Sequence, residues 1–170
     1  MTNRFLKYGF VFIVLILLQV LLFNNIEFSG YVNPYVYVMF ILILPLEIPA
    51  WVFLIISFLT GLTVDIFTGS LGIHTSASLF AGFCRPYVLR LIAPRDGYES
   101  GAEISMGNYG LNWFLIYAVI IVLIHHTVLF YFEVFRFKDF FRTLLRVIFS
   151  SAFTLAFIML GEYYRSGKKR

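Results

Sequence analysis

Charged side chains are scarce in this chain. Asp, Glu, Lys and Arg make up only 13% of its 170 residues, whereas 61% of the residues are hydrophobic. A soluble domain carries about 25% charged residues, because its surface faces water. The composition therefore excludes a water-soluble globular fold and predicts an all-α membrane protein with a single transmembrane domain, residues 1–170.

Cysteine and histidine are also rare. Cys84 is the only cysteine, which excludes an intrachain disulfide, and the three histidines lack the spacing of metal ligands. His125 and His126 are neighbours that point about 100° apart on a helix, so we expect that they do not face one site. The sequence has no nucleophile elbow, no His-Glu-x-x-His pair and no phosphate-binding glycine loop. It thus predicts no enzymatic activity, no metal and no cofactor.

Long apolar runs dominate the chain, most of them long enough to cross a hydrocarbon core of about 30 Å. Asn33-Pro34 opens the second run, where proline suits the first helical turn, and Pro45 and Pro49 bracket the reversal before the third. The first run lacks a small-residue cleavage site, which predicts a retained span. The expected fold is a compact bundle of about six transmembrane helices. They cover residues 5–23, 32–46, 48–67, 73–89, 111–132 and 141–164.

The basic residues predict the orientation of the bundle. Cytosolic loops are enriched in Lys and Arg, and a cytosolic N-terminus with six spans places most of the thirteen on the inside. We therefore expect a multi-pass protein of the bacterial cytoplasmic (inner) membrane with both termini in the cytosol, its basic residues anchored to lipid headgroups rather than nucleic acid. Arg85, Arg90 and Arg95 are candidates for cytosolic contacts. The inner residues are Arg4, Lys7, Arg85, Arg90, Arg95, Arg165, Lys168, Lys169 and Arg170; the outer ones are Arg136, Lys138, Arg142 and Arg146.

Asp65 is the most informative polar residue. A carboxylate near the end of an apolar helix costs several kcal/mol unless it lies at the interface, is paired or lines a polar cavity. Gly61 lies one turn earlier on the same face, so this face is expected to approach another helix closely. Three interpretations stay open: Asp65 caps the turn around Gly69 to Gly72, it holds a partner or a buried polar contact, or it takes part in proton or substrate chemistry.

The order of these features resembles the rod shape-determining protein MreD family. The resemblance lies in the basic N-terminus, a first span that ends in Leu-Gln-Val-Leu-Leu-Phe, the Asn33-Pro34 pair, and Gly61-x3-Asp65-x3-Gly69-x-x-Gly72. It implies a non-enzymatic membrane scaffold of the bacterial cell-elongation (rod) complex, which supports peptidoglycan synthesis and cell shape. The implied partners are MreC, through its transmembrane helix and periplasmic part, and also MreB, RodA and a penicillin-binding transpeptidase. The implied partner-binding or structural motif consists of Asn33, Pro34, Gly61, Asp65, Gly69 and Gly72.

The MreD family is also similar to the substrate-binding S-components of energy-coupling-factor transporters, which are six-helix bundles. The alternative function is therefore a small-molecule-binding subunit of a membrane transporter. It predicts an outward-open pocket with convergent polar groups. Polar residues within the expected spans are few, however: Gln19, Asp65, His125 and His126 are nearly the whole set. Whether the protein binds only lipids and these partners or also forms a homodimer stays open.

Overall fold

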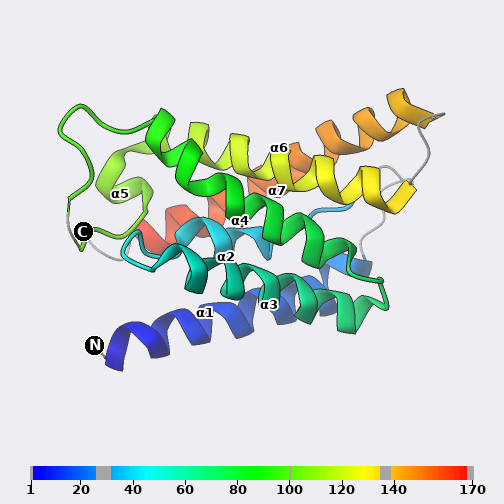
Figure 1. Ribbon diagram of the computed structural model, residues 1–170, viewed down its shortest axis with the longest axis horizontal. Helices are drawn as coiled ribbons and strands as arrows, with labels where there is room; N and C mark the ends of the chain where they lie inside the picture. The colour runs from blue at the N-terminus through cyan, green and yellow to red at the C-terminus, as the bar shows by residue number, and fades with distance from the viewer. Residues whose placement is uncertain (1, 26–31, 100, 135–138, 168–170) are drawn as a thin grey trace.

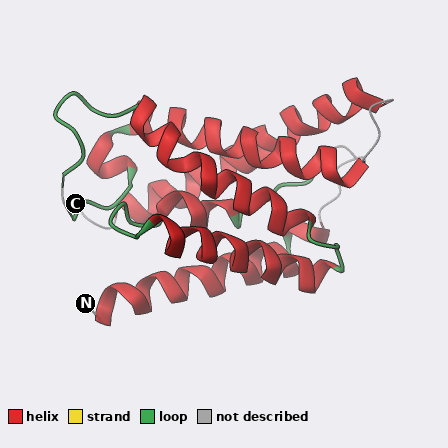
Figure 2. Cartoon of the chain, in the orientation of Figure 1, coloured by secondary structure: helices red, strands yellow, loops and turns green. Residues whose placement is uncertain are grey.

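The computed structural model describes residues 2–25, 32–99, 101–134 and 139–167 of the chain, and within them it consists of helices and loops without a strand. Four segments are long and apolar enough to cross a membrane: Leu6–Asn25, Ala50–Thr68, Leu111–Val134 and Phe140–Gly167. The expected all-α membrane protein is confirmed at this level. The elements are α1 (Thr2–Leu21), the 3-10 turn η1 (Phe23–Asn25), α2 (Val38–Ile43), α3 (Ala50–Thr68), α4 (Ile73–Leu91), α5 (Met106–Tyr109), α6 (Leu111–Val134) and α7 (Phe140–Gly167) (Figures 1 and 2).

Five of the six expected segments form long helices, with ends within a few residues of the expected ones, although α4 is not among the four segments that are long and apolar enough to cross a membrane. The five helices are α1, α3, α4, α6 and α7. Helices α1, α3 and α6 run in one direction along the bundle, and α4 and α7 run back, so α1 begins at the end where α7 stops (Figure 1). We call this the terminal end, and we call the end that holds the α3–α4 turn the distal end. Residues 136, 138 and 168–170, which contribute to the expected orientation, lie outside the described residues.

The second expected helix, residues 32–46, is wrong in length. Only Val38–Ile43 is helical, and an extended segment precedes it. Pro34 therefore does not occupy a first helical turn. The N–H groups of Asn33 and Tyr35 bond to side chains of α7 instead of to helical carbonyls, which agrees with the late start of α2. The short α5, in the loop between α4 and α6, was not expected at all.

Side chains from neighbouring helices satisfy the backbone of the extended segment. Ser150 Oγ accepts a hydrogen bond from the Asn33 N–H at 3.0 Å, and Thr154 Oγ1 accepts one from the Tyr35 N–H at 2.9 Å. Gln19 Nε2 donates to the Pro34 carbonyl at 3.2 Å. Irregular backbone at membrane depth is tolerated where protein groups satisfy it. These polar residues thus permit a broken helix in the centre of the bundle.

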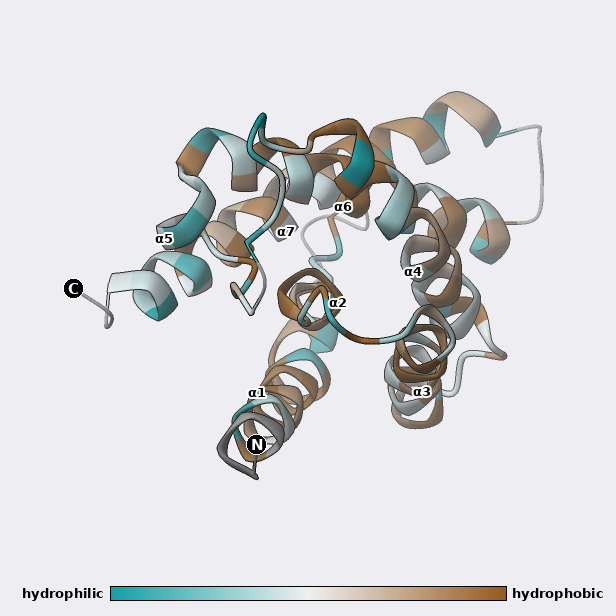
Figure 3. Ribbon diagram, turned by 60° about the vertical axis from the view of Figure 1, so that its left-hand side comes forward, coloured by the Kyte–Doolittle hydropathy of each residue, from teal (hydrophilic) through white to brown (hydrophobic). Residues whose placement is uncertain are grey.

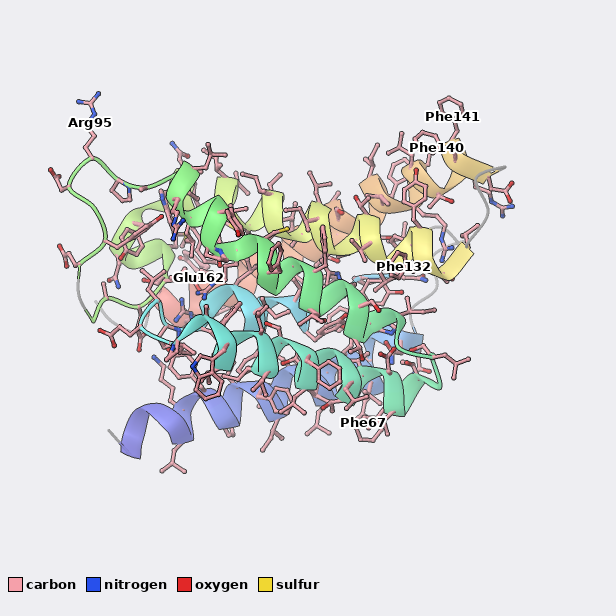
Figure 4. The ribbon with its side chains drawn as sticks, viewed as in Figure 1. Phe67, Arg95, Phe132, Phe140, Phe141 and Glu162 are labelled. Atoms are coloured by element: carbon pink, nitrogen blue, oxygen red, sulfur yellow. The ribbon has the colours of Figure 1, made fainter. Side chains whose placement is uncertain are left out.

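The core of the bundle is built around α2. All six of its side chains are buried, and Tyr37 and Leu44 on either side of it are buried as well. Apolar side chains around the whole circumference of a helix are typical of a fully enclosed one. Figure 3 shows α2 surrounded by the longer helices, whose colouring is largely hydrophobic. The outward faces of the long helices carry exposed apolar side chains, among them Phe67, Phe132, Phe140 and Phe141 (Figure 4).

An ionic network connects three parts of the chain at the terminal end of the bundle. Lys7 of α1 pairs with Glu103 of the α4–α6 loop at 2.6 Å, and Arg165 of α7 lies 3.6 Å from the same carboxylate. Arg165 also pairs with the buried Glu162 at 2.6 Å, and Glu162 accepts the Met106 N–H at 2.8 Å. Figure 4 shows Glu162 within the bundle. The network therefore holds α1, α7 and the longest loop together at one end.

Candidate functional site

Helices α3 and α4 form an unusually close pair. A Cβ placed on Gly61 would lie 2.5 Å from the carbonyl oxygen of His74, and one placed on Gly82 would lie 2.5 Å from Ser57 Oγ. Small residues at such crossings allow helix backbones to approach each other in a membrane. The expected close approach of the Gly61 face is confirmed, and the helix that approaches it is α4 of the same chain.

Asp65 caps the start of α4. Its Oδ1 accepts from the His74 N–H at 3.0 Å and its Oδ2 from the Thr75 N–H at 2.8 Å, and the Thr75 hydroxyl donates to Oδ2 at 2.5 Å. The first N–H groups of a helix lack partners within the helix, and a carboxylate there also opposes the positive end of the helix dipole. The capping interpretation is confirmed only in part, because the donors are the N–H groups of His74 and Thr75 rather than those of residues 69–72. Asp65 is also buried and bonded to side chains, which agrees with the interpretation as a buried polar contact.

The turn between the two helices depends on Gly69 and Gly72. Gly69 ends α3 with φ +68°, and Gly72 precedes α4 with φ +81°. Both values lie in the left-handed region, where glycine has no Cβ to clash. The expected glycine turn is thus confirmed, and it brings Ser70 and His74 back over Asp65.

Ser70, His74 and Asp65 form a hydrogen-bonded triangle that sequence reasoning missed. Ser70 Oγ donates to Asp65 Oδ1 at 2.6 Å and lies 2.9 Å from His74 Nδ1, which is 3.0 Å from Asp65 Oδ1. In a Ser-His-Asp catalytic relay, the serine and the carboxylate contact opposite nitrogens of the imidazole. Here both contact Nδ1, so the geometry orients the His74 ring and does not form a relay.

A polar cavity of about 500 Å³ lies at the distal end, next to this triangle. Asn33 and Tyr35 contribute to its wall from the segment before α2, and Ser70 and His74 contribute from the α3–α4 turn. Asn24 and Glu133 also line it, from η1 and from the end of α6. Of the motif residues predicted from the sequence, only Asn33 lines this cavity. Pro34, Gly61, Asp65, Gly69 and Gly72 are not among the lining residues, although Ser70 and His74 contribute from the turn that the glycines shape.

His125 and His126 are both buried in the middle of α6, and their ring centroids lie 6.4 and 5.5 Å from the centroid of the Tyr35 ring. Their hydrogen bonds lead to different elements, His125 to the segment before α2 and His126 to α7, which agrees with the expectation that they do not face one site. The His74 ring lies 5.3 Å from the same tyrosine.

These histidines make conventional hydrogen bonds. The Tyr37 hydroxyl lies 2.7 Å from His125 Nε2, and His126 Nε2 lies 3.0 Å from Thr154 Oγ1. Within the described part of the chain, no three His, Cys, Asp or Glu side chains are grouped so that they could hold a metal ion. The arrangement links α6 and α7 to the broken central segment.

Arg85 is not available for the cytosolic contact that the sequence suggested. Its side chain is buried, its Nε donates to the Tyr117 hydroxyl at 2.7 Å, and its Nη2 donates to the carbonyl of Leu44. The guanidinium also lies over the Phe53 ring, 4.4 Å from the centroid. Carbonyls at a helix C-terminus attract cations, which explains why Arg85 turns inward beneath α2.

Arg90 and Arg95 remain exposed at the terminal end. Figure 4 shows Arg95 on the loop after α4, with its side chain directed away from the bundle. Nearby, the Tyr98 hydroxyl donates to the Leu89 carbonyl at 2.6 Å, and burial raises the pKa of Tyr98 to about 12. The hydroxyl is therefore protonated at neutral pH and holds the loop against α4.

Comparison with protein-family models, with curated proteins and with solved structures gives no match for this chain.

Proposed function

We propose that this chain is a non-enzymatic scaffold of the bacterial cell-elongation complex, which binds MreC in the inner membrane and supports peptidoglycan synthesis and cell shape. The observation that carries the proposal is that residues of the Asn33-Pro34 segment and of the turn after Gly61–Asp65 share one cavity wall at the distal end, where the Tyr35 and His74 rings lie 5.3 Å apart. These two segments hold the residues that resemble the MreD family. Their contacts shape a fixed turn and a cavity wall, without a relay between Ser70 and Asp65.

The proposed topology has six crossings and two cytosolic termini. The segment of residues 32–46, which follows α1 and precedes α3 in the chain, runs from the distal end back toward the terminal end and is the proposed second crossing (Figure 1). Protein groups satisfy its backbone, which supports a membrane-embedded position. Arg90 and Arg95 at the terminal end agree with the enrichment of basic residues on the cytosolic side. In this topology the distal end faces outward.

The exposed face of α1 is the proposed docking surface for the MreC transmembrane helix. Leu6, Phe10, Ile13 and Leu17 form an apolar stripe on α1 that is more than half exposed at each position. Gly9 lies within this stripe, and a Cβ placed there would meet no other atom within 4 Å. A glycine on an open apolar face allows a second helix to approach closely.

Substitution of Gly9 by Leu tests this surface. Gly61→Leu and Asp65→Ala would disturb the α3–α4 pair itself, whereas Gly9→Leu adds a side chain in open space. We expect co-purification of MreC from native membranes to fall about fivefold, or about 1 kcal/mol, because the larger side chain separates the helices. Ala152→Leu on the exposed face of α7 is the matched control. The scaffold proposal is wrong if the wild-type protein does not retain MreC. If Gly9→Leu and Ala152→Leu retain MreC equally, only the assignment of the docking surface to α1 is contradicted.

A transporter subunit is the second candidate function, and the distal cavity is the observation that favours it. A binding subunit needs a pocket open to one side of the membrane with convergent polar groups, and Asn33, Tyr35 and His74 supply such groups. This candidate predicts that an ATPase module stays bound to the protein in mild detergent. Retention of MreC without an ATPase would contradict it.

A further inference from the structure

Two residues that line the distal cavity each hold a buried polar atom without a hydrogen-bond partner. These atoms are His74 Nε2 and Asn33 Oδ1. The His74 side chain is 8% exposed. A buried polar atom without a partner costs about 1–3 kcal/mol. Such atoms beside a cavity indicate that the cavity holds something able to bond with them.

Both atoms are hydrogen-bond acceptors. The Asp65 carboxylate lies 3.0 Å from His74 Nδ1 and places the imidazole proton on that nitrogen, which leaves Nε2 with a lone pair. The amide oxygen of Asn33 accepts by its nature. An occupant must therefore present hydroxyl or N–H donors to this part of the wall.

The charges around the cavity favour a neutral occupant. None of the described residues that line the cavity is Lys or Arg, so this part of the wall offers an anionic group no cation. Glu133, which lines the cavity, is paired with Arg146 at 3.2 Å, so its charge is already compensated. Phe23 and Phe67 add aromatic surface, which suits the apolar faces of a ring.

We propose that the distal cavity binds a small, uncharged molecule that is rich in hydroxyl and amide groups, with His74 Nε2 and Asn33 Oδ1 as acceptors. A volume of about 500 Å³ falls within the range of about 300–1,000 Å³ that is typical of small-molecule sites. The site is compatible with a scaffold, because its lining is separate from the α1 stripe. The proposed site also supplies a ligand class for the second candidate function, the transporter subunit. Binding of this ligand does not require the ATPase module of such a transporter.

Four sugars that share one ring and differ in one group provide the probes. Glucose and N-acetylglucosamine are neutral, whereas at pH 6 glucosamine is a cation and glucuronate is an anion. The full-length protein in lipid nanodiscs would be titrated with each by calorimetry, and its melting temperature recorded with and without each probe. We expect saturable binding of the neutral probes with a Kd of about 1 mM, and binding of the charged probes that is about tenfold weaker.

Two variants keep this test specific to the cavity. Asn33→Leu removes one acceptor from the wall, and Asn25→Trp places a large ring on the exposed 3-10 turn that borders the cavity. Each is expected to weaken binding of the neutral probes about tenfold. Asn112→Leu, an exposed position at the start of α6 in the terminal end, is the matched control and should bind as the wild type does.

Three results would overturn the assignment. Absence of saturable binding by either neutral sugar would mean that water alone fills the cavity. Equal binding of neutral and charged sugars would reject the ligand class. Unchanged binding by Asn33→Leu and Asn25→Trp, each with a wild-type melting temperature, would place the sugar elsewhere. None of these results would bear on retention of MreC, so the scaffold proposal is tested separately.

Discussion

Asp65 illustrates how one intramembrane carboxylate is kept in place by donors from a single turn. Two backbone N–H groups, two hydroxyls and one imidazole nitrogen surround its two oxygens at 2.5–3.0 Å. Transfer of a carboxylate from water into the protein costs less free energy when several hydrogen-bond donors replace its hydration. Its contribution is to the start of α4 and thereby to the shape of the distal end.

Replacement of Asp65 by Ala should destabilise the protein. The His74 and Thr75 N–H groups would lose their acceptor, and the loss of a helix cap alone costs about 0.5–2 kcal/mol. We expect a loss of about 2 kcal/mol or more in the free energy of unfolding, measured by equilibrium unfolding in mixed micelles. Asp96→Ala in the exposed loop is the control and should change this free energy little. A wild-type value for Asp65→Ala would show that the cap is unimportant.

Replacement of Arg85 by Met should also be costly. It would leave the Tyr117 hydroxyl and the Leu44 carbonyl without their charged partner, at about 1–3 kcal/mol for each group. The same change at the exposed Arg90 is the control and should be nearly neutral. Melting temperatures of the two purified variants in one detergent distinguish the cases. Similar temperatures would contradict the inward orientation of Arg85.

The cap could be predicted from the sequence at the residue scale, but the position of Arg85 could not. Asp65, Gly69 and Gly72 are close in the chain, so local chemistry determines their geometry. Arg85 lies near the end of a helix. An arginine that contacts lipid headgroups and one that is buried in the bundle look the same in the sequence at such a position. Only the position of the α2 carbonyls, more than 40 residues away in the chain, decides between them.

At the scale of elements, the α3–α4 pair depends on the absence of a side chain at Gly61. In Gly61→Ala the new methyl group would overlap the backbone at His74, which cannot yield as a flexible side chain would. We expect a loss of about 1–3 kcal/mol in unfolding free energy, the usual cost of overpacking. Gly9→Ala, which meets nothing within 4 Å, should be neutral or slightly stabilising because alanine favours helices. The interpretation fails if both variants unfold alike.

The broken central segment depends on hydroxyl groups of α7. Thr154→Val would leave the Tyr35 N–H and one nitrogen of His126 without a partner, for which we expect a loss of about 1–3 kcal/mol. Thr63→Val is the matched control, because the Thr63 hydroxyl bonds only to the Leu59 carbonyl of its own helix. Thermal unfolding of both variants in nanodiscs measures the difference. A neutral Thr154→Val would contradict the role assigned to this hydroxyl.

The five long helices were predictable because each is an apolar run bounded by glycine, proline or charge. Segment 32–46 was not, since an apolar run gives the same signal whether it forms one helix or a buried extended chain followed by a short helix. Two features did carry information: the Asn33-Pro34 pair and the hydroxyl and amide residues of neighbouring spans. Recognising that Gln19, Ser150 and Thr154 act together required their positions in space.

At the scale of the whole molecule, the two ends of the bundle differ in chemistry. The terminal end joins Lys7, Glu103 and Arg165 in one ionic network, whereas the distal end holds a polar cavity without Lys or Arg among its described lining residues. Composition alone predicted a membrane bundle. The cavity was foreseen only as a requirement of the alternative function, because its wall comes from four separate parts of the chain.

The central claim, six crossings with the second formed by residues 32–46, is tested most directly by cysteine accessibility. Two variants, Asn25→Cys and Glu47→Cys, would each be made in a Cys84→Ser background. Cells with a permeabilised outer envelope and an intact inner membrane would then be treated with a membrane-impermeant maleimide. Both positions are exposed and flank the segment. The account predicts labelling of Asn25→Cys at once, and labelling of Glu47→Cys only after the inner membrane is permeabilised. Labelling of both positions from the same side would contradict it.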